Sequence, residues 1–164
     1  MKTSDVLIVI DMQNGVCDGI YRRNEFIEQI NQRILIYRKE KKPIIFIQHH
    51  DDELIKESEG WQLLPELLTE STDSYVEKTH ANGFYQTKLQ MLLEKLSVKA
   101  IEFCGAQTEF CVNTTVVFAD GLSYRNFMQK RASSTFDNHW LTAREMIDYY
   151  ENHLWQGRFL QIKD

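Results

Sequence analysis

The segment Val6–Ile10 is apolar at every position, and it constrains the fold more than any other part of the chain. A strand that exposes one face to water alternates apolar and polar side chains, whereas a strand covered on both faces is apolar throughout. A helical pattern follows over residues 22–42, where apolar side chains recur every three or four positions. A buried strand followed by an amphipathic helix predicts a parallel sheet with helices on both faces.

The same alternation continues along the chain. Further strands are predicted at residues 44–47, 75–78, 99–104, 126–130 and 158–162. Further helices are predicted at residues 87–96, 112–121 and 140–154, with a short helix or turn within 61–68. The expected fold class is therefore α/β: a single domain over residues 1–164 with three α/β/α layers. Its sheet is expected to be doubly wound, Rossmann-like and mostly parallel, with about six strands in the order 3-2-1-4-5-6.

Composition and charge exclude several classes of function. The 164 residues are 43% hydrophobic and 26% charged, which is ordinary for a soluble globular domain. A formal net charge of -5 gives no electrostatic reason to expect nucleic acid or a membrane surface as a partner. The first apolar run is too short for a signal peptide core or a membrane span. Three cysteines without tight spacing argue against a disulfide framework, so we expect a cytoplasmic protein.

Three reactive side chains stand where such a sheet binds ligands, beyond the carboxyl ends of its strands. Asp11 follows the first strand, Lys78 ends the third, and Cys111 follows the fourth after a turn that starts at Gly105. A helix-like run begins with Cys111, and the positive end of a helix dipole favours a thiolate. Each residue alone has a structural interpretation, as a turn acid, a surface lysine or a small buried hydrophobe. Together they indicate a catalytic crevice.

Other candidate residues carry weaker signals. His49 and His50 follow the second strand and precede Asp51, but adjacent residues on a strand point to opposite faces and make a poor pair of metal ligands. Cys104 is interpreted as a core residue, and nothing assigns a role to Cys17. The chain contains no G-x-G-x-x-G, no G-x-x-x-x-G-K-[ST] and no C-x-x-C. We therefore expect no cofactor, and a weak metal site at His49, His50 and Asp51 is the less favoured alternative.

Three segments, in this order, resemble the isochorismatase-like cysteine hydrolase superfamily, which includes nicotinamidases and N-carbamoyl amidohydrolases. They are residues 7–14, which hold the first strand and its acid, residues 78–89, which begin with the lysine, and residues 105–112, which hold the cysteine turn. Each segment alone is a weak signal, but together they are specific. The whole chain can be fitted to the family pattern.

The resemblance implies a catalytic triad of Asp11, Lys78 and Cys111 that hydrolyses a small amide or carbamoyl compound through a thioester. It also implies a cis peptide bond between Ala106 and Gln107, with the backbone N–H groups of Gln107 and Cys111 forming an oxyanion hole. A small-molecule substrate and a homo-oligomer, either a dimer or a tetramer, are further implications. Two alternatives stay open: vinyl ether hydrolysis of the isochorismatase type, and a non-catalytic binding protein on the same scaffold.

The chain also departs from the family pattern. Gly15 and Val16 stand where many relatives have an acidic and an aromatic residue, and no clear Asp-x-His metal set follows the second strand, which argues against nicotinamidase activity. Arg131 stands where relatives often have an acidic residue. The loops at residues 14–21, 49–62 and 79–86 are expected to form the pocket walls. Aromatic walls would suit a flat or small apolar amide, and the expected lining consists of Tyr21, His50, Trp61, Phe84 and Tyr85.

Overall fold

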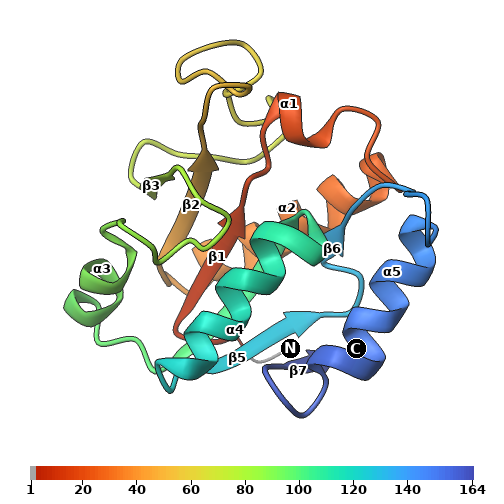
Figure 1. The fold of residues 1–164 in the computed structure, drawn as a ribbon. Coiled ribbons are helices and arrows are strands. Elements are labelled where there is room, and N and C mark those ends of the chain that lie inside the picture. Colours follow the sequence, from red (N-terminus) through yellow and green to blue (C-terminus); the bar gives the residue numbers. More distant parts are fainter. Residues whose placement is uncertain (1–2) are drawn as a thin grey trace.

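The computed structural model describes residues 3–164, which form a parallel sheet with helices on both faces (Figure 1). The sheet has seven strands in the order β3-β2-β1-β4-β5-β7, and β6 pairs with β4 off this path. The strands are β1 (Val6–Ile10), β2 (Ile44–His49), β3 (Ser74–Lys78), β4 (Ala100–Ala106), β5 (Arg125–Gln129), β6 (Ser133–Ser134) and β7 (Gln161–Lys163).

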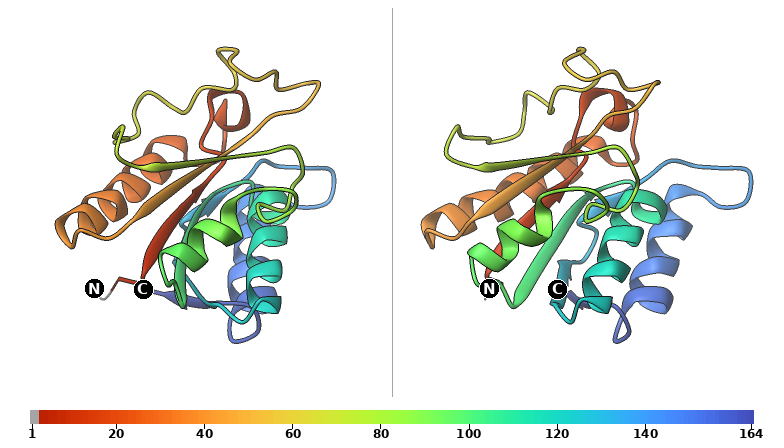
Figure 2. Two further views of the ribbon diagram at one scale, coloured as in Figure 1. Left: turned by 90° about the vertical axis from the view of Figure 1, so that its left-hand side faces the viewer. Right: turned by 60° about the vertical axis from the view of Figure 1, so that its left-hand side comes forward.

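Helices flank this sheet on both sides (Figure 2). They are α1 (Asn14–Cys17), α2 (Arg23–Lys39), α3 (Leu89–Lys95), α4 (Asn113–Gly121) and α5 (Ala143–Tyr149). Two π-helical segments, η1 (Thr108–Val112) and η2 (Tyr150–Trp155), run directly into α4 and out of α5, respectively. Figure 2 places α2 on one face of the sheet and α3 and α4 on the other, which is the three-layer arrangement.

The central strand β1 is buried along its whole length, as its continuous apolar pattern predicts. In the register of the sheet, Ile10 pairs with Ile47 of β2 and with Gly105 of β4. His49 pairs with Lys78 between β2 and β3. The carboxyl ends of four strands therefore meet at one edge of the sheet, which is where the candidate catalytic residues lie.

Gly105 allows β1 and β4 to approach each other closely at this edge. Its φ of +131° lies in a region that side-chain-bearing residues rarely adopt, and a Cβ built on it would lie 2.1 Å from the backbone oxygen of Ile10. Only glycine fits this contact, because the obstacle is backbone that cannot move aside. The contact brings the turn after β4 next to the end of β1.

A buried ion pair fixes α2 to the sheet. The Arg33 guanidinium donates to both carboxylate oxygens of Glu102 on β4, over 2.6 and 2.7 Å, and the hydroxyl of Tyr37 donates to the same carboxylate over 2.9 Å. Arg33 and Glu102 are almost completely buried. Such a pair needs both partners, since removal of one leaves an uncompensated charge in the core.

The expected fold class and strand order are confirmed, and the expected last strand is β7. The short strand β6 was not predicted, because two serines carry no periodic signal. Of the helix or turn expected within residues 61–68, the structure has a turn at Pro65, which the N–H of Leu67 closes by donating to the carbonyl of Leu64 over 3.0 Å. Just before it, Leu63 bridges to Gln13. The helix expected up to residue 154 changes to π-helical geometry at Tyr150. No helix in the described part of the chain combines the length and the apolar character that crossing a membrane requires.

Candidate active site

The Asp11 carboxylate is buried at the point where the chain leaves β1. The backbone turns there through a positive φ of 50°, a conformation that Asp tolerates better than most residues. The Asp11 N–H donates to the carbonyl of Ile47 over 2.9 Å, so the turn is attached to the end of β2. Only 1% of the Asp11 side chain is exposed, and its Oδ2 lies 2.8 Å from Nζ of Lys78.

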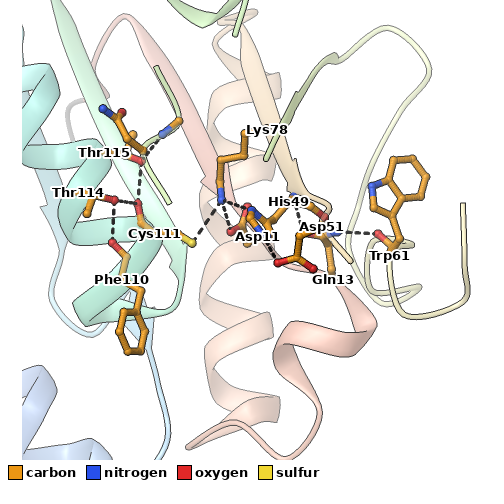
Figure 3. Close-up of polar contacts among 12 residues, drawn as sticks. Asp11, Gln13, His49, Asp51, Trp61, Lys78, Phe110, Cys111, Thr114 and Thr115 are labelled. Atoms are coloured by element: carbon orange, nitrogen blue, oxygen red, sulfur yellow. Dashed lines mark hydrogen bonds and ion pairs between the residues drawn. The ribbon is translucent and has the colours of Figure 1, made fainter. Parts of the chain in front are cut away.

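Lys78 is the centre of the site. Its side chain is fully buried, and its ammonium contacts Oδ2 of Asp11 at 2.8 Å, Nδ1 of His49 at 3.1 Å and Sγ of Cys111 at 3.3 Å. Figure 3 shows the amine between the thiol on one side and the acid and imidazole on the other. The structure thus brings together the three residues that the sequence singled out, and it adds a histidine.

Cys111 lies inside the first helical turn rather than at its first residue. The π-helical segment η1 starts at Thr108, three residues before Cys111, where the helix-like run was expected to begin. The carbonyl of Cys111 accepts a hydrogen bond of 2.7 Å from the hydroxyl of Thr115, and that hydroxyl also accepts the N–H of Gly83 over 2.9 Å. Thr115 therefore links the cysteine turn to the segment that follows Lys78.

The thiol of Cys111 is not activated by a low pKa in this structure, contrary to the expectation from the helix dipole. Burial, followed by the charge of the Asp11 carboxylate, raises the pKa of Cys111 to about 12, although Lys78 acts in the opposite direction. The positive charge of Lys78 cannot stabilise a thiolate fully, because Asp11 already balances it. The resting group is therefore a neutral thiol beside a carboxylate.

A cleft of about 850 Å³ opens above these residues. Its lining consists of Asp11, Gly15, Val16, His49, Asp51, Glu53, Leu54, Ser58, Gly60, Gln107, Phe110 and Cys111. The peptide bond between Ala106 and Gln107 is cis, at the position that the family resemblance implies. Both residues of the expected oxyanion hole, Gln107 and Cys111, face the cleft. Phe110 is the aromatic residue in the lining, and it is 58% exposed.

The aromatic lining expected from the sequence lies elsewhere. Trp61 borders a separate hollow with Gln48 and Tyr75, on another side of the β2 end. Tyr21 borders a small cavity beside the start of α2. Neither residue is among those that line the cleft beside Asp11 and Cys111.

The remaining three residues of that expected lining are held away by neighbours of their own. Phe84 is buried and packs against Phe118 and Tyr124. Tyr85 packs edge-on against His80. His50 faces Glu77, whose carboxylate lies 4.0 Å from the imidazole. The walls are formed instead by the small and acidic residues of the 51–60 loop.

Gly15 explains one departure from the family pattern. A Cβ at this position would lie 2.7 Å from Cδ1 of Leu54 and 3.2 Å from the backbone oxygen of Gly60. The N–H of Gly15 donates to that same oxygen over 2.8 Å. The missing side chain thus lets the 51–60 loop pack directly on α1.

Cys17 and Arg131 lie outside the cleft. Cys17 is completely buried, its Sγ lies 3.7 Å from the backbone oxygen of Asp11, and burial raises the pKa of its thiol to about 12. The backbone N–H of Arg131 donates to the buried carboxylate of Glu151 over 2.5 Å. Cys17 thus contacts the backbone of Asp11 rather than its carboxylate, and neither Cys17 nor Arg131 lines the cleft.

His49, Asp51 and Gln13 are the site residues that the sequence analysis did not assign to the active site. Nε2 of His49 lies 2.8 Å from Oδ2 of Asp51. The Gln13 side chain accepts the N–H of His49 over 2.8 Å and donates to its carbonyl over 2.9 Å. Position at the end of β2 was the available signal, but ring orientation is not readable from sequence. Within residues 3–164, no group of three or more His, Cys, Asp or Glu side chains is arranged to hold a metal ion.

Comparison with known proteins agrees with this geometry. The family model described as Isochorismatase domain matches residues 5–152. A crystal structure of an isochorismatase family protein is 44% identical, with a TM-score of 0.94 over 97% of both chains. Nicotinamidase 3 of Arabidopsis thaliana is 28% identical over 80% of this chain and 73% of its own length. Streptothricin hydrolase of Streptomyces noursei is 26% identical over 80% of this chain and 50% of its own length. The chain therefore belongs to the isochorismatase-like cysteine hydrolase superfamily.

Proposed function

We propose that this protein hydrolyses a small amide or carbamoyl compound through a thioester on Cys111. One observation carries the proposal: the fully buried amine of Lys78 contacts Asp11 at 2.8 Å and Cys111 at 3.3 Å at the floor of an open cleft. An acid, a cation and a thiol in contact provide a base, a charge partner and a nucleophile. The relative named a nicotinamidase supports an amide as the substrate.

In the proposed first step, Sγ of Cys111 attacks the amide carbonyl carbon while the thiol proton passes to Asp11. The carbonyl oxygen becomes an oxyanion, which accepts hydrogen bonds from the backbone N–H groups of Gln107 and Cys111. One such donor contributes about 3 to 4 kcal/mol to transition-state stabilisation in well-characterised hydrolases. The intermediate then collapses, and Asp11 returns the proton to the leaving ammonia or amine.

In the second step, water hydrolyses the thioester. Asp11 accepts a proton from the water, whose oxygen attacks the thioester carbonyl, and Cys111 leaves as the thiol after that proton is returned. The oxyanion forms again at the same donors. Between the steps the Asp11 carboxylate and the Lys78 ammonium, 2.8 Å apart, compensate each other's charge. No step needs a histidine base, a metal or another cofactor.

The charge of the cleft narrows the substrate class. Asp51 and Glu53 line its wall, and none of the described lining residues is a lysine or an arginine. Lys78 is not part of the lining, and its buried ammonium is already paired with Asp11. A substrate carboxylate would meet like charges without a cationic partner, so a neutral or cationic amide fits better. The same charge pattern disfavours the vinyl ether alternative, since isochorismate is a dicarboxylate.

The experiment is a screen of small amides and carbamoyl compounds for release of ammonia or amine, with Cys111→Ala as the matched control. We expect the wild-type protein to turn over at least one compound and the variant to lose turnover while keeping the thermal unfolding midpoint. Full turnover by the variant would refute the proposal. Turnover also distinguishes an enzyme from a non-catalytic binding protein. Slow alkylation of Cys111 cannot make that distinction, because a thiol with a high pKa reacts slowly in either case.

Other expectations accompany this function as proposals. Residues 1–164 are taken as one hydrolase domain, in a cytoplasmic protein that forms a dimer or tetramer and binds neither nucleic acid nor membrane. Light scattering of the purified protein measures the oligomeric state directly. A chelator is expected to leave the activity unchanged.

A further inference from the structure

We propose that His49 and Asp51 are positioning residues that hold the Lys78 ammonium in register between Asp11 and Cys111. This inference rests on the proposed function of the triad and adds to it a chain of contacts running from the loop after β2 to the thiol. These contacts run from Asp51 to His49, from His49 to Lys78 and from Lys78 to Cys111, and Lys78 also forms the ion pair with Asp11 (Figure 3).

The ammonium of Lys78 has as many protons as it has acceptors. An ammonium carries three N–H donors and no lone pair. Lys78 contacts one acceptor atom each on Asp11, His49 and Cys111, and its side chain has no exposed surface from which water could replace any of them. Loss of the His49 acceptor would leave one buried N–H without a partner and release the ammonium to rotate away from Sγ.

The contact with Lys78 also fixes the tautomer of His49. Because an ammonium can only donate, Nδ1 of His49 must accept, and the ring proton of the neutral imidazole must be on Nε2. Nε2 lies 2.8 Å from Oδ2 of Asp51, which can accept that proton in a hydrogen bond. The imidazole therefore connects the donor Lys78 on one side with the acceptor Asp51 on the other, and only one ring orientation allows both contacts.

Asp51 is itself held in place by the loop that it starts. Its Oδ1 accepts the N–H groups of Glu53 and Leu54, over 2.9 and 2.7 Å. These backbone hydrogen bonds, Leu54 first, together with His49 lower the pKa of Asp51 to about 2, so the carboxylate is ionised at neutral pH. From the other side, Gln13 fixes the backbone of His49 through both its N–H and its carbonyl.

His49 and Asp51 also line the cleft, so direct contact with substrate is the competing role. The two roles differ in kinetics. A residue that aligns Lys78 acts on the chemical step and changes kcat, whereas a residue that binds the substrate equally in ground and transition states changes KM. The test therefore uses variants that keep or remove the Nδ1 acceptor.

His49→Phe keeps an aromatic ring and removes the acceptor, and His49→Asn keeps a polar atom at the position of Nδ1. We expect His49→Phe to lower kcat about 10- to 100-fold with KM changed less than about threefold, as expected for a misplaced catalytic group. His49→Asn should recover most of this loss. His50→Phe is the matched control, because the adjacent imidazole faces Glu77 instead, and it should keep the wild-type kcat.

A second readout needs no substrate. In ¹⁵N NMR of the ammonium groups, the Lys78 signal is identified by its absence in Lys78→Met, and we expect slow exchange with water in the wild type and in His49→Asn. In His49→Phe the signal should broaden or disappear. This measurement tests the positioning role even if no amide is turned over. Absence of turnover would count against the proposed function and not against the positioning role.

Three outcomes would overturn the inference. One is a His49→Phe variant with wild-type kcat and an unchanged Lys78 signal. Another is a loss confined to KM, which would make His49 a substrate contact. The last is a wild-type enzyme that a chelator reduces to the kcat of His49→Phe, which would make His49 a metal ligand.

Discussion

Nζ of Lys78 lies 2.8 Å from Oδ2 of Asp11, and the two side chains are 0% and 1% exposed. Their charges compensate each other in a place that water does not reach, so neither can be removed without leaving the other uncompensated. Burial and this pair together determine the state of the neighbouring thiol. Cys111 contacts an ion pair with no net charge rather than a free cation, and in the proposed mechanism it stays protonated until attack transfers its proton to Asp11.

The pair can be tested by a double-mutant cycle. Lys78→Met and Asp11→Asn should each lower the free energy of unfolding by about 3 to 5 kcal/mol, since each leaves a buried charge unpaired. The double variant should recover much of that loss, because no charge is then left uncompensated, while activity stays absent. Urea unfolding and amide hydrolysis measure the two effects. Additive losses of stability would show that the residues do not act as a pair.

The raised pKa of Cys111 predicts that its thiol reacts slowly with alkylating reagents in the absence of substrate. A pKa of about 12 leaves a smaller fraction of thiolate at pH 7 than in a free thiol, and that fraction grows as pH rises. Iodoacetamide should therefore alkylate Cys111 more slowly than it alkylates glutathione at pH 7, with a rate that increases towards alkaline pH. Peptide mass spectrometry separates Cys111 from the buried Cys17 and Cys104. Faster alkylation than glutathione at pH 7 would contradict a protonated resting thiol.

Glu151 gives the fold a pH dependence of its own. Burial raises its pKa from 4.5 to about 7, so the carboxyl binds its proton more tightly in the folded chain than in the unfolded one. Its contribution to stability is therefore fully present below pH 4.5 and is lost as the pH rises through 7. Glu151→Gln, which stays neutral, should gain stability over the wild type by at most about 3 kcal/mol between pH 4.5 and 8. A difference between the two proteins that does not change with pH would be inconsistent with this shift.

Gly105 should not accept a side chain. In Gly105→Ala the new Cβ meets the backbone of Ile10 and φ is unfavourable, so we expect a loss of about 3 kcal/mol or more in the free energy of unfolding. Activity should fall as well, because the same contact sets the spacing of Asp11 and Cys111. Gly121→Ala is the control, since nothing lies within 4 Å of its added Cβ. Equal stability of the two variants would argue against the close approach of β1 and β4.

The acidic wall of the cleft predicts a preference by charge. Among matched amides that differ in one substituent, neutral and cationic compounds should have a higher kcat/KM than the corresponding carboxylates. Glu53→Gln should reduce the ratio of kcat/KM between neutral amides and carboxylates several-fold, because it removes one of the repelling charges. Added salt should reduce this ratio as well. A wild-type preference for carboxylates would mean that another cation reaches the substrate.

The sequence predicted the sheet and the meeting of Asp11, Lys78 and Cys111, because both depend on where the strands lie and end. Continuous apolar runs locate buried strands, and the residues just beyond Ile10, at Lys78 and after Ala106 must share one edge of a parallel sheet. The pocket walls could not be predicted in this way. They depend on the path of the 51–60 loop, which packs on α1 through Gly15 and Gly60, a contact between distant segments without periodicity.

The state of the thiol was also beyond the reach of sequence. A helix start argues for a low pKa of Cys111, but the outcome is decided by burial and by the pairing of Lys78 with Asp11, which are properties of the folded chain. His49 is a similar case. Its place at the end of β2 is visible in the sequence, whereas its contacts with Lys78 and Asp51 depend on one ring orientation.

Interception of the intermediate by hydroxylamine tests the central claim most directly. If Cys111 forms a thioester, hydroxylamine added during turnover should compete with water, giving the hydroxamate of the acyl group, or a hydroxyurea from a carbamoyl substrate. The yield should rise with hydroxylamine concentration and vanish in Cys111→Ala. Turnover that gives the hydrolysis product alone at every hydroxylamine concentration would contradict a covalent intermediate and assign the attack to water.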